Sequence, residues 1–202
     1  MTAAASWESA GETFPPEITS ALNSSGDADL IDLKLLAAIP EWEVRLSGGE
    51  TASQTDVLAL ARNERGLCVI AVEAKVDEDF GPLLSERRTE VSLGQGNRLD
   101  ELHKLLGVAS MDGSIRYQFL HRTASAILTA REFHAHVAVM LVHSFGSKAS
   151  LRSDFAAFCT ALRTRKLPGD ICEAPFPKQP RLLIAWCDGD KKFLEANLPS
   201  VM

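Results

Sequence analysis

Hydrophobic and polar residues alternate over residues 42–46, and this period of two predicts a half-exposed β-strand. Residues 56–61 and 67–75 are apolar on both faces, which is typical of strands in the centre of a sheet. Between these two segments, the residues Asn-Glu-Arg-Gly at 63–66 are typical of a tight turn. The pattern therefore predicts a half-exposed strand followed by a hairpin of two central strands.

Other segments have apolar residues at helical spacing. Asp27 or Asp29 is a suitable N-cap for a helix that runs to Ile39, and Pro40 would end it. Further along the chain, we expect helices over 97–106, 115–130 and 151–165, strands over 135–143 and 182–187, and a proline-rich loop over 168–180. The resulting order is helix, three strands, helices, strand, helix, strand, which is an α/β pattern with a helical crossover.

The length of 202 residues favours one domain. Residues 1–26 are rich in Ala, Ser, Glu, Gly and Pro, and we interpret them as a flexible N-terminal arm with at most a short helix around Glu17–Leu22. Residues 27–202 then form a single domain. Short, separated apolar runs are enough for one core, and no apolar run is long enough to suggest a membrane span. No secretory signal is evident either, so a cytoplasmic protein is expected.

Charge and cysteine usage narrow the functional classes. The chain has 27 acidic and 21 basic residues, a net charge of −6, which argues against a general DNA-coating protein. It does not exclude a nuclease, because active-site carboxylates are acidic and a bound metal reverses the local field. The four cysteines form no CxxC pair and are not spaced with the histidines as zinc ligands, so we expect reduced thiols.

The predicted hairpin brings two carboxylates and a lysine together. A loop of either two or four residues gives the same register, in which Asp56 lies opposite Glu73 on one face of the sheet. Lys75 lies two residues beyond Glu73 and therefore shares that face. A three-residue loop would instead turn Asp56 away. The spacing alone is equally compatible with an alternative, in which Asp56 only begins a strand and Glu73 and Lys75 form a surface pair at a strand end.

Two opposed carboxylates at the ends of apolar strands repel each other, and burial increases the cost. A divalent cation between Asp56 and Glu73 would remove this conflict, and the backbone carbonyl of Ala74 is a plausible third ligand. Carboxylate oxygens, a carbonyl and water are the ligands that Mg²⁺ prefers, and Mn²⁺ can substitute. Lys75 beside such an ion could orient the attacking water or stabilise charge on a phosphate.

The residues Thr55-Asp56 before the hairpin and Glu73-Ala74-Lys75 after it resemble the motif of the PD-(D/E)XK nuclease superfamily. This resemblance implies a restriction-endonuclease-like αβββαβ core, a mixed β-sheet flanked by helices. It also implies that Asp56 and Glu73 hold the metal and that Lys75 assists catalysis. Thr55 stands where proline is usual. Within the superfamily, segments 72–82 and 117–125 resemble a small bacterial group, which implies a fold and a site without a substrate.

Two residues of the later helix are supporting candidates. Gln118 and Arg122 are four residues apart and share a helix face. In the superfamily, the helix after the lysine strand often supplies a polar residue to the site, and Arg122 could bind a phosphate through its planar guanidinium. The alternative is an ordinary pair on the helix surface. His121 points about 100° away from Arg122 and is interpreted as a packing or surface residue.

These observations favour a metal-dependent nuclease that hydrolyses phosphodiester bonds of nucleic acid, with DNA favoured as the partner and Mg²⁺ or Mn²⁺ as the cofactor. A homodimer is conceivable, because many such nucleases pair to cut two strands. The alternative is a catalytically inactive module of the same fold that serves as a binding or regulatory partner. The acidic net charge favours this second hypothesis.

Overall fold

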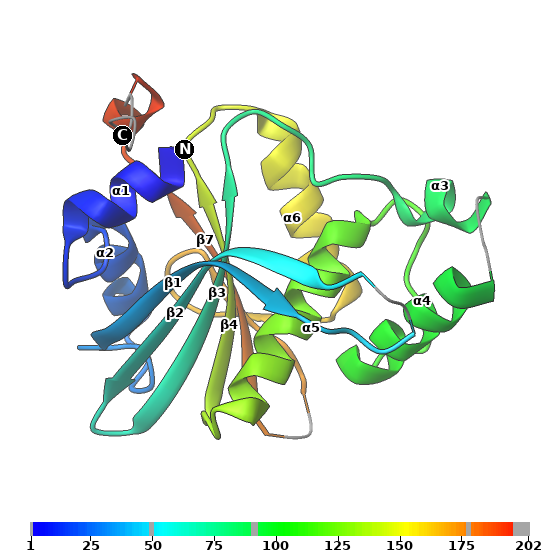
Figure 1. The fold of residues 1–202 in the computed structure, drawn as a ribbon, viewed down its shortest axis with the longest axis horizontal. Helices are drawn as coiled ribbons and strands as arrows, with labels where there is room; N and C mark the ends of the chain where they lie inside the picture. The colour runs from blue at the N-terminus through cyan, green and yellow to red at the C-terminus, as the bar shows by residue number, and fades with distance from the viewer. Residues whose placement is uncertain (1, 49–50, 90–92, 177–178, 196–202) are drawn as a thin grey trace.

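A seven-stranded mixed β-sheet organises the chain (Figure 1). The computed structural model describes residues 2–48, 51–89, 93–176 and 179–195. The strand order across the sheet is β1-β2-β3-β4-β7-β6-β5. The strands are β1 (Lys34–Val44), β2 (Ser53–Asn63), β3 (Gly66–Lys75), β4 (Val137–Ser144), β5 (Arg165–Lys166), β6 (Ile171–Glu173) and β7 (Arg181–Asp188).

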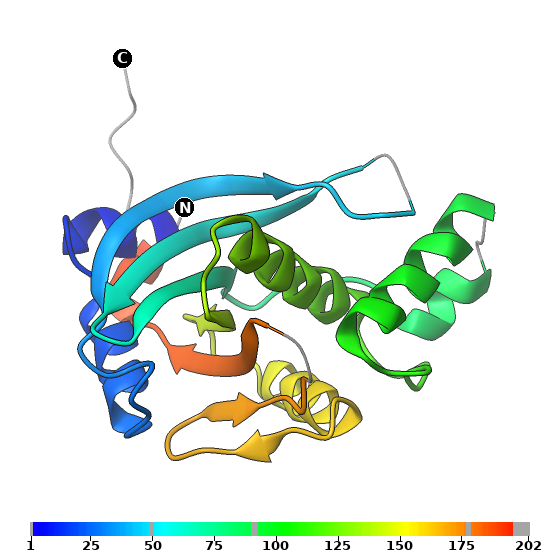
Figure 2. The same cartoon turned by 90° about the horizontal axis from the view of Figure 1, so that it is seen from below.

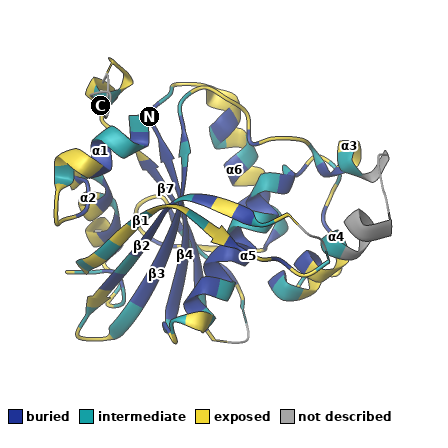
Figure 3. Ribbon diagram, viewed as in Figure 1, coloured by how far each residue is buried: buried dark blue, intermediate teal, exposed yellow. Residues whose placement is uncertain are grey.

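The pairing of the strands changes from antiparallel to parallel and back to antiparallel across the sheet. β1, β2 and β3 are successively antiparallel, β3, β4 and β7 are parallel, and β6 and β5 add an antiparallel edge. The central strands are the most buried ones (Figure 3), as their uninterrupted apolar sequences require. The expected α/β class with a mixed sheet and flanking helices is confirmed.

Helices cover both faces of this sheet (Figure 2). On one face lie α4 (Leu93–Leu106), α5 (Tyr117–Glu132) and α6 (Ala149–Ala161), and on the other lie α1 (Thr2–Ala10) and α2 (Pro16–Ser24). The short helix α3 (Leu84–Thr89) and the 3-10 helix η1 (Lys191–Glu195) complete the described structure. None of the described helices is long and apolar enough to cross a lipid bilayer.

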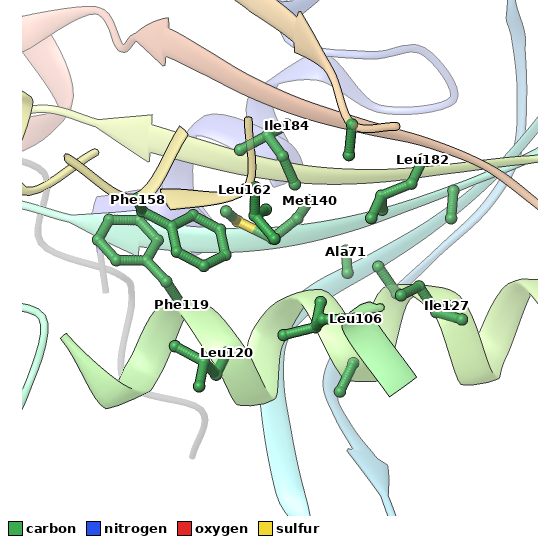
Figure 4. Packing of buried hydrophobic residues seen from close by; sticks show 14 of the residues in the cluster. Ala71, Leu106, Phe119, Leu120, Ile127, Met140, Phe158, Leu162, Leu182 and Ile184 are labelled. Atoms are coloured by element: carbon green, nitrogen blue, oxygen red, sulfur yellow. The ribbon is translucent and has the colours of Figure 1, made fainter. Parts of the chain in front are cut away.

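The core on the α5 face is close-packed. Phe119 of α5 stacks on Phe158 of α6, and Leu120 and Ile127 of α5 share one buried cluster with Ala71 and Met140 of the sheet (Figure 4). Burying one such large apolar side chain contributes about 1.5–3 kcal/mol. Helix α5 is therefore held firmly over β3 and β4, and residues in its first turns have fixed positions relative to the end of β3.

The N-terminal residues differ from the flexible arm that we expected. They form α1 and α2, and Ile18 and Leu22 of α2 are fully enclosed in the core on that face, together with Trp7 of α1. Composition did not reveal this, because only a few large apolar residues among the small and polar ones are needed to attach these helices. The N-terminal segment is thus an integral layer of the fold.

The helix predicted from Asp27 to Ile39 is wrong. Residues 27–33 are turns, and β1 begins at Lys34 with alternating exposure along its length. Asp27 does not cap a helix: its carboxylate binds the guanidinium of Arg181 at 2.7 and 2.8 Å. Pro40 lies inside β1, which is tolerated because β1 is an edge strand of the sheet.

The hairpin and the later elements follow the prediction closely. Asn63 pairs with Gly66, so the turn has two residues, and the pairs Leu60–Val69 and Leu58–Ala71 have the register that a loop of two or four residues predicts. The helices and strands predicted after residue 97 are present with shifted ends. Four short elements were not expected: the helix α3, the strand β5, the strand β6 inside the proline-rich loop, and the 3-10 helix η1. All four cysteines are free thiols, as predicted.

Candidate functional site

The strands β2 and β3 separate at the end of the hairpin. They pair from Asn63–Gly66 as far as Val57–Val72. Beyond this point, β2 continues to pair with β1 as far as Ser53, whereas β3 continues to pair with β4 as far as Lys75. Figure 1 shows β1 and β2 leaving the direction of β3, β4 and β7. The hairpin register carries Asp56 and Glu73 to the point of separation.

The carboxylate of Asp56 occupies the gap between the two strands. Its Oδ2 accepts a hydrogen bond of 2.7 Å from the backbone N–H of Ala74, where the β2–β3 ladder has ended. In a strand, the N–H and the C=O of one residue point to the same side. The carbonyl of Ala74 therefore faces the same gap as Asp56. A third ligand of an ion bound in this gap would need that orientation.

Glu73 is the centre of a buried polar cluster. Its Oε1 accepts a hydrogen bond of 2.6 Å from Nε2 of Gln118 and lies 2.9 Å from Nζ of Lys75. Its Oε2 accepts a hydrogen bond from Nε of Arg122. Glu73 is only 4% exposed, so these three partners replace water almost completely. The structure thus unites Glu73 with the predicted residues Lys75, Gln118 and Arg122.

Lys75 is itself buried, at 5% exposure. Its Nζ lies 5.3 Å from the ring centroid of Phe80, in a cation–π contact. A weaker contact of 3.8 Å joins Nζ to Glu78. These contacts hold the ammonium group beside Glu73 at the end of β3, within the same cluster as Asp56.

The two carboxylates influence each other electrostatically. The pKa of Asp56 is raised from 3.8 to about 6, first by burial and then by the negative charge of Glu73. The hydrogen bond from Ala74 and the positive charges of Arg122 and Lys75 lower this pKa but do not compensate. The site therefore has one carboxylate that is costly to ionise, which is the conflict that the sequence predicted.

A cavity of about 480 Å³ reaches the site from the α1 side of the sheet. Asp56 and Lys75 line it, together with Ala74, and Trp7 of α1 forms part of its wall. Glu8, Glu41 and Glu78 add acidic side chains to the lining. Asp56 and Lys75 are thus accessible to a small solute from this side, whereas Glu73 is enclosed under α5.

The residues present fit a hard divalent cation. Two carboxylates and the Ala74 carbonyl are the oxygen donors that Mg²⁺ and Mn²⁺ accept. Next to them, Oε1 of Gln118 is buried and accepts no hydrogen bond from the described residues, so one more oxygen is available. Among the described residues, no group of three or more His, Cys, Asp or Glu side chains is placed to hold a metal. Any ion here therefore depends on backbone and amide oxygens as well.

Sequence reasoning missed two neighbours of this cluster. Ser53 Oγ accepts a hydrogen bond of 3.0 Å from Nη1 of Arg122 and lies 2.9 Å from Nδ1 of His121. Ser53 begins β2, outside the motif, and no local pattern distinguishes it. His121 is a packing residue, in agreement with one of the two expected readings, and its contact with Ser53 fixes the ring beside Arg122.

The chain is a mixed α/β protein whose central hairpin ends in a cluster of two carboxylates, a lysine, an arginine and a glutamine. It belongs to the family described as Domain of unknown function (DUF6946), whose model matches residues 1–191. That match includes α1 and α2, so these helices are part of the family's domain. No curated protein and no solved structure matches the chain.

Proposed function

We propose that the protein is a metal-dependent phosphodiester hydrolase of the PD-(D/E)XK type that acts on nucleic acid, with DNA favoured. One observation carries the proposal. Asp56 and Glu73 reach the point where β2 and β3 separate, and Lys75 lies beside Glu73 on the same strand. The order α2, β1, β2, β3, then the helices α3, α4 and α5, then β4, supports an αβββαβ core of the restriction-endonuclease-like kind in which α5 is the core helix.

Asp56, Glu73 and the carbonyl of Ala74 would hold the ion. A bound Mg²⁺ or Mn²⁺ supplies Lewis acidity toward a phosphate oxygen and lowers the pKa of a water ligand. Lys75, through Nζ, orients the attacking water or stabilises charge that develops on the phosphate. Gln118 and Arg122 hold Glu73 in place beside Lys75, where its carboxylate would face a bound ion.

A second candidate is a module with this fold that does not catalyse. The observation that favours it is the saturation of Glu73: both of its oxygens are bonded to Lys75, Arg122 and Gln118. An ion must compete with two cationic partners for this carboxylate. In such a module, the cluster would serve only to attach α5 to the end of β3.

Cleavage assays separate the two candidates. Supercoiled plasmid, single-stranded DNA and RNA are incubated with the protein in Mg²⁺, in Mn²⁺ and in EDTA. We expect metal-dependent cleavage of at least one substrate, and a loss of about 10²–10⁴-fold for Lys75→Met, since a positioned proton donor or acceptor contributes that much. Glu101→Gln, in an exposed pair with Lys104 on α4, is the control and should cleave normally.

The inactive module predicts a different set of results. The protein would cleave none of the substrates with either metal, and Mn²⁺ would bind no better to the unaltered protein than to Asp56→Asn. That combination would remove the hydrolase proposal. Cleavage that persists in Lys75→Met would equally contradict the role assigned to this lysine.

A further inference from the structure

Two arginines near the candidate site have no acidic partner among the described residues. Arg87 of α3 places its guanidinium 4.1 Å from the ring centroid of Tyr117, and Arg98 of α4 donates a hydrogen bond of 2.6 Å from Nη2 to the carbonyl of Thr51. Nε of Arg98 is buried and has no partner among the described residues. In the described part of the chain, neither guanidinium forms an ion pair. Arg116, at the start of α5, shows the contrast, because it pairs with Asp154 at 2.9 Å.

A series of contacts connects Arg87 with the carboxylate cluster. Tyr117, on which Arg87 stacks, lies 5.1 Å from the ring of His121. His121 contacts Ser53, and Ser53 accepts the hydrogen bond from Arg122, which also binds Glu73. On the other side, Thr51 joins Arg98 to the segment that leads into β2. The two arginines therefore adjoin the site through α5 and β2.

Four positive charges act on His121. Its pKa is lowered to about 3, mainly by burial and further by the positive charges of Arg122, Arg87, Arg98 and Lys75. His121 is consequently neutral at physiological pH and adds no charge. Of these four cations, the described structure pairs only Arg122 and Lys75 with a carboxylate. A local excess of positive charge thus lies beside the site, in a chain with a net charge of −6.

We propose that Arg87 and Arg98 bind phosphate groups of the nucleic acid strand next to the phosphate that is cleaved. This inference rests on the proposed function and adds the path of the substrate, which runs over α3 and α4. A half-buried guanidinium without a counter-charge is costly, and a phosphate satisfies it through two parallel hydrogen bonds. The stacking of Arg87 on Tyr117 and the bond from Arg98 to Thr51 hold both guanidinium groups ready for such a ligand.

Binding is measured apart from cleavage. Fluorescence anisotropy with a labelled single-stranded DNA, its duplex and an RNA of the same sequence is recorded in EDTA over a range of KCl concentrations. We expect Arg87→Ala and Arg98→Ala to weaken binding about 5- to 10-fold each, and each to reduce the slope of log Kd against log salt by about one. Arg65→Ala, in the turn at the far end of the hairpin, is the matched control and should change neither quantity.

The outcomes distinguish this inference from the proposed function. If the arginine variants lose affinity as expected but the unaltered protein never cleaves, the phosphate site is supported and the hydrolase proposal fails. If the unaltered protein cleaves but Arg87→Ala and Arg98→Ala bind nucleic acid as tightly as Arg65→Ala, the phosphate site is overturned. Absence of binding to all three nucleic acids overturns it too. If Arg98→Ala fails to fold, the affinity and the salt dependence of Arg87→Ala decide.

Discussion

The ammonium group of Lys75 lies 2.9 Å from Oε1 of Glu73, which stands two positions earlier on the same strand. Both side chains are about 95% buried. Because alternate residues of a strand point to one face, the pairing is a direct consequence of the Glu-Ala-Lys sequence. Its burial, in contrast, is a consequence of α5, which covers the end of β3 and adds Arg122 and Gln118.

Replacing Glu73 by Gln should destabilise the protein. Glu73→Gln leaves the buried Arg122 without its carboxylate partner and leaves Lys75 with only its weaker contact to Glu78. We expect the free energy of unfolding to fall by about 3 kcal/mol, as when one partner of a buried ion pair is removed. Urea denaturation measures it. Glu101→Gln, which removes an exposed partner of Lys104, should lose less than about 1 kcal/mol.

Replacing Asp56 by Asn should stabilise the metal-free protein, and the gain should depend on pH. In the folded state the pKa of Asp56 is about 6, compared with its ordinary 3.8, so the folded protein holds this proton more tightly than the unfolded chain. Between pH 4 and pH 6 the stability contributed by Asp56 therefore falls as pH rises. The advantage of Asp56→Asn should grow from near zero at pH 4 to about 2–3 kcal/mol at pH 7.

Asp79→Asn is the control for this pH dependence. Lys148 lowers the pKa of Asp79 through a hydrogen bond at the surface, so the charged form is favoured there. Asp79→Asn should consequently give no stabilisation at pH 7. A pH-independent difference between Asp56→Asn and the unaltered protein would contradict the raised pKa of Asp56.

Divalent metal should raise the thermal unfolding midpoint through the same carboxylate. A ligand that binds only the folded state stabilises it by about 2.7 kcal/mol at a hundredfold excess over Kd. We expect Mn²⁺ to raise the midpoint of the unaltered protein at pH 7.5 but not that of Asp56→Asn. The effect should decline as pH falls below 6, because the ion must then displace the proton of Asp56. An equal shift in both proteins would place the ion elsewhere.

Replacing Ile18 by Ala should reveal that the N-terminal helices belong to the folded unit. Ile18 is fully buried between α2 and the sheet, so the truncation removes apolar contacts and leaves a cavity. We expect a loss of about 2–5 kcal/mol in chemical denaturation. The exposed Thr19 provides the control, since Thr19→Ala should change stability by less than about 0.5 kcal/mol. A negligible effect of Ile18→Ala would restore the interpretation of a flexible arm.

Sequence by itself determined the hairpin and its register, which brings Asp56 and Glu73 to the point where β2 and β3 separate. Turn residues and the period of two along a strand act over a few neighbours, so the register followed from local chemistry. It did not determine whether Lys34–Val44 is strand or helix, because its apolar residues suit both periods. Only pairing with β2 decided that, at the edge of the sheet.

The tertiary structure alone decided the surroundings of the site. Glu73 meets Arg122 across 49 residues of chain, and Arg98 meets Thr51 across 47 residues. Such contacts depend on how α4 and α5 pack against the sheet, a matter of non-local burial that no short segment encodes. The same packing buries Glu73, raises the pKa of Asp56 and leaves Arg87 and Arg98 without acidic partners among the described residues.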